Sequence, residues 1–210
     1  MKYTTVLWDF NGTVVNDVHI GIRAINKMLE KRNLKTIDSV EAYHRVFRFP
    51  VKEYYRLVGF DFETEPYEDL AVEWVKNFTA DEISLKLNDG FLEVWEHLNA
   101  TGVKQMILSS SETEMLNRQI ALLGLSHKFD EILGTGDIFA GGKIEMARKC
   151  LGTEVKNTVL IGDTPHDADT AKAICADCIL YAGGHASFAS LSRRGFRTVR
   201  HLSELIPLLT

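Results

Sequence analysis

Short apolar runs rich in β-branched residues recur along the chain, and they constrain its fold more than any other feature. Few polar residues alternate within them, which is typical of parallel strands covered on both faces. Stretches with helical spacing separate the later runs, and two of these stretches close on glycine. The alternation predicts an α/β fold with a doubly wound, Rossmann-like parallel sheet. The runs cover residues 4–10, 104–110, 130–136, 157–163 and 178–182, and the helical stretches cover 90–102, 112–125 and 142–152.

The segment from residue 15 to residue 84 departs from this rhythm. Its apolar residues have helical spacing, and no convincing strand interrupts them. We therefore predict an α/β catalytic core made of residues 1–14 and 85–210. A small all-helical cap domain of residues 15–84 is expected to be inserted after the first strand.

The composition is that of an ordinary globular chain, with 210 residues, 45% of them hydrophobic, and a formal net charge of -5. Because no block of Lys and Arg stands out, we expect no nucleic-acid partner. No apolar run approaches the ~20 residues that a membrane span needs, and the first residues leave no room for a signal peptide. We expect a cytoplasmic protein with no membrane partner.

The chain has three cysteines, which is too sparse and odd a set for a disulfide framework. Cys175 and Cys178 form a C-x-x-C pair, but a redox pair usually lies at a helix N-terminus. This pair follows the expected end of a helix, and two thiols are only half of a zinc site. We interpret both as buried apolar thiols.

Polar side chains stand where several of the predicted strands end. Asp9 closes the first run, Ser109 the second and Asp163 the fourth, with Asp167 four residues further on. Lys143, which opens the helix after the third run, is either part of this group or a solvated surface lysine. Ligands of open α/β sheets bind outside the carboxyl ends of the strands, so we expect these side chains to meet there. Such a group suits a Mg²⁺ ion and a phosphate, because hard cations take carboxylate oxygens.

Plainer interpretations compete at some of these positions. Asp167 and Asp169 both fall in the first turn of a predicted helix, where acids stabilise the helix dipole. We treat Asp169 as such an acid and Asp167 as functional. Ser110 and Ser111 are candidates to cap the following helix. Asp9 has no comparable explanation, because an acid that ends a buried strand is costly unless something uses it.

These motifs, in this order, resemble those of the haloacid dehalogenase superfamily over nearly the whole chain. The superfamily's first motif, Asp-x-Asp-x-Thr, is matched by residues 9–13 except at its second Asp, where this chain has Asn11. The helical insert and the tail "YAGGHAS" resemble the phosphoglycolate phosphatase-like branch, which has a small helical cap. The other three motifs are matched by Ser109, by Lys143, and by Gly162, Asp163 and Asp167.

The resemblance implies a Mg²⁺-dependent phosphatase acting on a small phosphorylated metabolite. Asp9 would attack phosphorus and become an aspartyl phosphate. The Mg²⁺ ion would be held by Asp9, the backbone carbonyl of Asn11 and Asp163. Asp167 would complete this metal site, orienting Lys143 or a metal-bound water. The residues that would hold the phosphate are Ser109, Lys143, Ser110 and Gly12, the last by letting the backbone turn close to it.

Asn11 replaces the residue that, in the family's phosphatases, protonates the leaving oxygen and then activates water. Such acid–base help contributes about 10²–10⁴-fold. One account is a phosphatase limited to esters whose leaving group departs without a proton, or a phosphatase that recruits another acid such as His19 or a cap residue. A second account resembles phosphonoacetaldehyde hydrolase, which forms a Schiff base on a cap lysine, here Lys52. A third is deamidation of the Asn11–Gly12 pair, and a fourth is a non-catalytic phosphate-binding sensor.

The cap is expected to select the substrate, since the core motifs read only phosphate. Arg45, Arg48 and Lys52 are interleaved with aromatic residues around Pro50. Arg48, in a predicted loop, is our candidate for a substrate contact, because Arg binds carboxylate or phosphate with two donors. Arg48 and Lys52 are also explained as surface cations. His185 either approaches the site or only orders its loop, and nothing in the sequence predicts the oligomeric state.

Overall fold

The structure of the chain, a computed structural model, describes residues 2–136, 142–152 and 155–210. The described strands form a six-stranded parallel sheet with the order β5-β4-β1-β6-β7-β8. The predicted fold class is therefore confirmed. The strands are β1 (Thr5–Trp8), β4 (Lys104–Glu112), β5 (Glu131–Thr135), β6 (Thr158–Gly162), β7 (Asp177–Tyr181) and β8 (Arg197–Val199).

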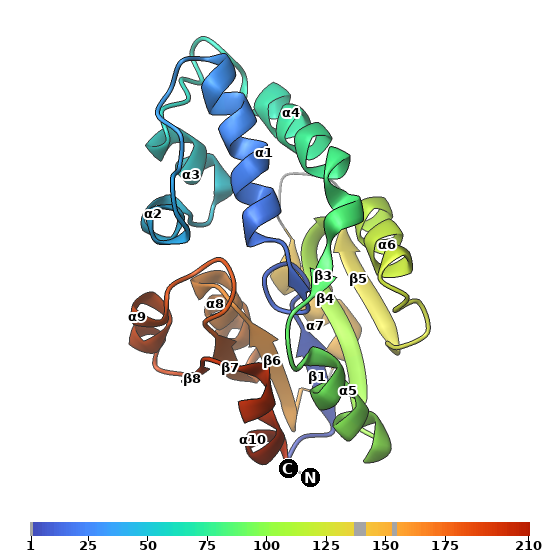
Figure 1. Cartoon of the computed structure of the whole chain (residues 1–210). Helices are drawn as coiled ribbons and strands as arrows, with labels where there is room; N and C mark the ends of the chain where they lie inside the picture. Colours follow the sequence, from blue (N-terminus) through green and yellow to red (C-terminus); the bar gives the residue numbers. More distant parts are fainter. Residues whose placement is uncertain (1, 137–141, 153–154) are drawn as a thin grey trace.

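Helices cover both faces of this sheet (Figure 1), because each central strand buries side chains in both directions. Val6 and Trp8 pack on one face, and Leu7 between them packs on the other. On the first face lie α5 (Phe91–Ala100), α6 (Thr113–Leu122), the 3₁₀ helix η3 (Leu202–Leu205) and α10 (Ile206–Leu209). On the second lie α7 (Lys143–Leu151), α8 (Pro165–Ile174) and α9 (Phe188–Leu191), which is followed by η2 (Ser192–Arg194).

The insert is helical and has a hydrophobic core of its own. Met28, Tyr54 and Leu70 belong to this third hydrophobic cluster, which is distinct from the two clusters on the faces of the sheet. Figure 1 shows the insert as a layer above the sheet. Its helices are α1 (Val18–Lys31), α2 (Val40–Val46), α3 (Val51–Leu57), α4 (Tyr67–Ala80) and the 3₁₀ helix η1 (Glu82–Ser84).

Short strands that the sequence analysis did not predict complete the fold. The strand β2 (Val15–Asn16) pairs antiparallel with β3 (Lys86–Leu87), so the two connections between the insert and the sheet lie side by side. The insert therefore begins after β2 and not directly after the first strand. A strand of two residues carries no alternating pattern, and neither does β8 with three. The domain limits at residues 14/15 and 84/85 stay predictions.

The cysteine prediction is right for one member of the pair. Cys178 is buried in β7, but Cys175 is exposed. Cys175 follows the last residue of α8 in a left-handed conformation with φ of 59°, which ends the helix before the chain enters β7. In the part of the chain that the structure describes, no helix combines the length and apolarity needed to cross a membrane.

Two buried glutamines test the value of buried hydrogen bonds in this core. Gln105 accepts from Trp8 Nε1 at 3.1 Å and donates to the Trp95 carbonyl at 3.1 Å. Gln119 is fully buried, and its amide has no hydrogen-bond partner among the described residues. Gln105→Leu should lower the free energy of unfolding by about 1–3 kcal/mol, because it leaves the buried Trp8 Nε1 without its acceptor. Gln119→Leu should leave it unchanged or raise it.

Urea unfolding of the two variants and the wild type measures this difference. The two substitutions remove the same amide and add the same side chain, so each is the control for the other. Equal losses of stability in both variants would contradict the assignment.

Candidate active site

Acidic side chains gather at the carboxyl end of the two central strands. Asp9 directly follows β1, and its amide donates to the Ile161 carbonyl of β6 at 2.8 Å. Asp163 directly follows β6, and Asp167 lies in the first turn of α8. All three are buried, and ligand oxygens of the three lie within 4.8 Å of one another. The carboxylates that the sequence predicted to meet are brought together.

Lys143, the first residue of α7, joins two of these carboxylates. Its Nζ donates to Asp9 Oδ1 and to Asp167 Oδ1, both at 2.5 Å, and the side chain is buried. The alternative of a solvated surface lysine is therefore wrong. Burial opposes the charge of Lys143, but Asp167 and Asp9 outweigh it and raise the pKa of the ammonium. Lys143 is a fixed cation at physiological pH.

The second oxygen of Asp167 holds the start of α8. It accepts from the Thr164 amide at 3.0 Å and from Thr164 Oγ1 at 2.7 Å, which makes a capping box. Burial would raise the pKa of Asp167, but Lys143 and then Thr164 outweigh it and lower the pKa. Asp167 is thus both the helix-start acid of the plainer interpretation and the partner of Lys143.

The acidic cluster carries more negative charge than the described residues around it neutralise. Burial, followed by the charge of Asp167, raises the pKa of Asp9 well above its usual range. Burial also raises the pKa of Asp163, despite His185 nearby and the bond that the His185 amide donates to Asp163 Oδ2 at 2.5 Å. Buried carboxylates with an unmet charge and oxygen donors close together fit a divalent cation such as Mg²⁺.

Gly12 lies against this cluster in a conformation that favours glycine. Its φ is 75°, and a Cβ atom there would collide with the Asp163 carboxylate and the His185 ring. The backbone after Asp9 therefore turns tightly beside Asp163, as the sequence analysis expected for this position.

Both ends of the Asn11 side chain are occupied. Nδ2 donates to Asp17 Oδ2 at 2.8 Å, and Oδ1 accepts from Ser111 Oγ at 2.7 Å. Asp17 Oδ1 also accepts from the Gly12 amide at 2.7 Å. A carboxylate at position 11 would face that of Asp17, so the surroundings suit an amide. Asp17 was missed because a single acid before a helix carries no signal of its own.

His185 approaches the site, so the alternative that it only orders its loop is wrong. Its Nε2 lies 3.2 Å from Asp17 Oδ1, and its Nδ1 lies 2.8 Å from the Tyr43 hydroxyl of α2. Burial would lower the pKa of His185, but Asp17 and then Asp163 outweigh it and raise the pKa to about 9. The ring therefore carries a charge that Asp17 already pairs.

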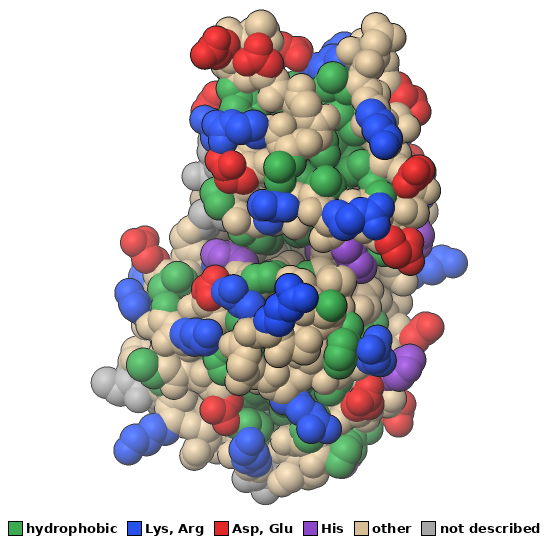
Figure 2. All heavy atoms as spheres, turned by 90° about the vertical axis from the view of Figure 1, so that its left-hand side faces the viewer, with side chains coloured by type: hydrophobic (Ala, Val, Ile, Leu, Met, Phe, Trp, Pro, Cys, Tyr) green, Lys and Arg blue, Asp and Glu red, His purple; other side chains and the backbone are tan. Residues whose placement is uncertain are grey.

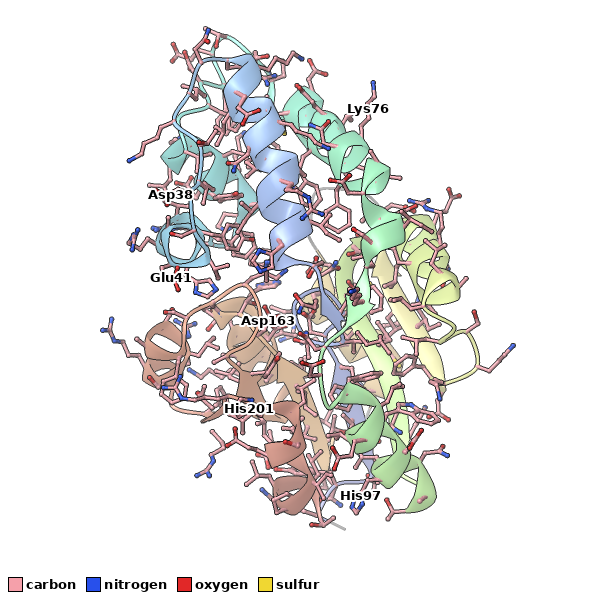
Figure 3. All side chains as sticks on the ribbon, in the orientation of Figure 1. Asp38, Glu41, Lys76, His97, Asp163 and His201 are labelled. Atoms are coloured by element: carbon pink, nitrogen blue, oxygen red, sulfur yellow. The ribbon has the colours of Figure 1, made fainter. Side chains whose placement is uncertain are left out.

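The cap meets the core above this cluster and encloses a cavity of about 150 Å³. His44 Nε2 lies 2.9 Å from the Gly184 carbonyl, and the Phe49 ring stacks on the His166 ring with centroids 4.7 Å apart. Figure 2 shows histidine side chains in the indentation between the cap above and the core below. Figure 3 shows Asp163 at this junction, beneath α1.

Comparison with known proteins identifies the family. The family model of haloacid dehalogenase-like hydrolases matches residues 6–181. The chain belongs to the haloacid dehalogenase-like hydrolases. It is a phosphatase-like hydrolase of this superfamily, as its motifs suggested, and it has a buried acidic cluster that fits a metal site.

Individual relatives are distant but extend over most of the chain. Pyrophosphatase PpaX of Halalkalibacterium halodurans is 24% identical over 172 residues, which are 80% of this chain and 78% of that protein. A haloacid dehalogenase-like hydrolase of Streptococcus pneumoniae has a TM-score of 0.84 at 17% identity, over 100% of this chain and 99% of that one. A predicted phosphoglycolate phosphatase of Haemophilus somnus has a TM-score of 0.79 at 16% identity, over 100% of this chain and 99% of that one. The structures share the fold, including the helical cap.

The structure places the remaining core candidates at the cavity. Ser109 is buried, lines it, and accepts from the Ser111 amide at 3.0 Å. Ser110 also lines it, and its hydroxyl is buried without a partner among the described residues. Neither Ser110 nor Ser111 caps α6. Glu112 does, accepting from the amides at positions 114 and 115, because a longer acid reaches the first turn from the N-cap position.

The cap candidates lie elsewhere. Arg48 donates to the Arg45 and Val46 carbonyls at the end of α2. It is absent from the described lining of this cavity but lines a neighbouring pocket together with Phe49 and His166, so its role as a substrate contact stays a prediction. Lys52 is exposed, and its ammonium lies over the Phe62 and Tyr67 rings at 5.2 and 5.5 Å. The sequence analysis placed both by charge and position, but each has found a local partner. His19 is also exposed.

Thermal unfolding with Mg²⁺ or with a chelator tests the metal site. Mg²⁺ should raise the midpoint of the wild type, because an ion that binds only the folded chain stabilises it by about 2.7 kcal/mol at a hundred times its Kd. Asp163→Asn removes a carboxylate charge while keeping an acceptor for Thr13 Oγ1, which donates at 3.0 Å. This variant should lose most of the shift. Asp69→Asn, at an exposed acid of α4, should keep it.

A shift of the same size in Asp163→Asn and in the wild type would show that Mg²⁺ acts elsewhere on the chain.

Proposed function

We propose that this chain is a Mg²⁺-dependent phosphatase that acts on a small phosphorylated metabolite through an aspartyl phosphate at Asp9. One observation carries the proposal. Asp9 ends a central strand at the floor of the cavity, and the ammonium of Lys143 holds its carboxylate in place. An aligned carboxylate beside a buried cation can serve as a nucleophile toward phosphorus.

The roles of the chain's residues follow from their positions. Asp9, Asp163 and the backbone carbonyl of Asn11 would hold Mg²⁺, with Asp167 beside them. When bound, the ion neutralises charge on the transferring phosphoryl group. The hydroxyls of Ser109 and Ser110 and the ammonium of Lys143 would hold phosphoryl oxygens, while Gly12 leaves room for the group. These roles are proposals that the cavity lining supports.

The first chemical step needs no proton from the chain. A carboxylate oxygen of Asp9 forms a bond to phosphorus as the bond to the leaving oxygen breaks, and the electron pair leaves with that oxygen. The Asn11 amide has no proton to give at this step. Esters whose leaving oxygen is stable as an anion, such as aryl and acyl phosphates, should therefore react faster than alkyl esters.

The second step is water attack on the aspartyl phosphate. Without a carboxylate at position 11 this step also lacks its usual base, so the phospho-enzyme should persist. A sensor that holds phosphate on Asp9 is the second candidate function, and the clamped Asn11 amide favours it. No observation favours Schiff-base chemistry at Lys52, whose ammonium rests on Phe62 and Tyr67.

Phosphate release from an aryl and an alkyl phosphate tests the proposal. The wild type should release phosphate from the aryl ester with Mg²⁺, and Asp9→Asn should abolish release. Asn11→Asp supplies the missing acid but places it against Asp17. The double variant Asn11→Asp/Asp17→Asn keeps a carboxylate and an amide at this contact and reverses the hydrogen bond. The double variant should cleave the alkyl ester about 10²–10⁴-fold faster than the wild type does. The single variant Asn11→Asp should gain less activity over the wild type than the double variant gains.

The outcomes separate the candidates. A stable phosphate on Asp9 without release would favour the sensor. Absence of both release and phosphorylation, in a chain that still binds Mg²⁺, would contradict aspartyl-phosphate chemistry.

A further inference from the structure

The upper wall of the cavity is aromatic. Phe47, Phe49, Tyr54, Tyr67 and Trp74 line it from the cap, opposite the acidic cluster. Phe47 packs edge-on against both Phe49 and Tyr54, with ring centroids 5.8 and 5.3 Å apart. An aromatic wall of this kind recognises an apolar, flat group by contact and excludes water from it.

The cavity has no free cation for a second anionic group. Among the described residues that line it, Lys143 is the only lysine or arginine, and it already binds Asp9 and Asp167. Both ring nitrogens of His185 are occupied by Asp17 and Tyr43. Within this cavity, a carboxylate or second phosphate on the leaving group would meet no free lysine or arginine among the described lining residues, and burying it there would be unfavourable. Arg45, Arg48 and Arg194 line a separate pocket beside Phe47 and Phe49.

The size of the cavity limits the leaving group. Its volume of about 150 Å³ equals that of an apolar protein cavity that accommodates benzene. One aromatic ring is therefore a better match to the aromatic part of the cavity than a nucleoside is.

Besides the Ser110 hydroxyl, two buried polar atoms of the described lining have no hydrogen-bond partner. The Tyr54 hydroxyl and His166 Nε2 are both buried, and neither has a hydrogen-bond partner in the part of the chain that the structure describes. Tyr54 is only 3% exposed, so water cannot reach its hydroxyl easily. Unpaired buried groups are rare because they cost stability, and a ligand that pairs them removes that cost.

We propose that the substrate is the phosphate monoester of a single-ring phenol, uncharged apart from its phosphate and carrying a polar substituent that reaches Tyr54. This inference rests on the proposed function and names its substrate class. In the reaction, Asp9 forms a bond to phosphorus, and the electron pair of the broken bond leaves on the phenolate oxygen. The phenolate takes a proton from solvent after release, so the Asn11 amide is no obstacle.

Binding of phosphonates to the Mg²⁺-loaded wild type tests the substrate class without any chemistry, because their carbon–phosphorus bond is not cleaved. Isothermal titration would compare benzylphosphonate, methylphosphonate and phosphonoacetate. Benzylphosphonate should bind at least about tenfold more tightly than the other two, since only it fills the aromatic cavity. Binding of phosphonoacetate as tight as that of benzylphosphonate would overturn the proposal.

The Tyr54 hydroxyl is tested with a second ligand. (4-Carbamoylbenzyl)phosphonate carries a polar substituent on the same ring. Tyr54→Phe should weaken its binding about fivefold to tenfold, the loss of one hydrogen bond, and leave benzylphosphonate unchanged. In the control Tyr3→Phe, the lost hydroxyl donates to Asp177, and neither residue belongs to the described lining of the cavity. This control should change the binding of neither phosphonate. Equal binding of the carbamoyl ligand by wild type and Tyr54→Phe would overturn the contact with Tyr54.

Failure of this inference and failure of the proposed function give different results. Phosphate release from aryl esters together with a preference for phosphonoacetate would overturn the aromatic substrate and leave the phosphatase in place. Selective binding of benzylphosphonate without phosphate release would support the aromatic ligand and contradict the phosphatase.

Discussion

The ammonium of Lys143 between Asp9 and Asp167 is the interaction on which the rest of the site depends. It joins the end of β1, the start of α7 and the start of α8 in a region that solvent scarcely reaches. Removing it would leave two buried carboxylates facing each other, which costs several times more than a surface ion pair contributes. Because the cluster holds three carboxylates and only this one cation, two negative charges stay unmet, and that excess favours a metal ion there.

The parts of the fold and site that could be predicted are those that depend on strand ends. Asp9 and Asp163 follow buried apolar runs, and parallel strands bring their carboxyl ends to one edge, so their meeting follows from the topology. Asp17 and Ser111 could not be predicted in this way. Both act through contacts with Asn11, and such contacts depend on how a loop folds, which no local pattern encodes. The strand β2 could not be predicted either, because two residues are too few to show an alternating pattern.

The cap shows the limit of arguing from charge. Arg48 and Lys52 stand in the segment that a substrate would approach, yet each is satisfied locally, one by backbone carbonyls and the other by aromatic faces. Sequence indicates which residues are in the segment but not which way they point. The nearby aromatic residues Phe47 and Tyr54 pack into the hydrophobic core of the cap and line the cavity, whereas Arg48 lines a neighbouring pocket.

The clamped Asn11 amide and the aromatic cavity are consistent with each other. The aromatic wall places apolar side chains rather than proton donors beside the leaving group, and the Asn11 amide offers no proton either. Under both conditions the leaving group must carry its own negative charge, and a phenolate does so by spreading it into the ring, whereas an alkoxide cannot. The ring that stabilises the departing charge is also the group that fits the wall formed by Phe47 and Tyr54. The same feature of the substrate therefore satisfies the chemistry at the floor of the cavity and the packing at its upper wall.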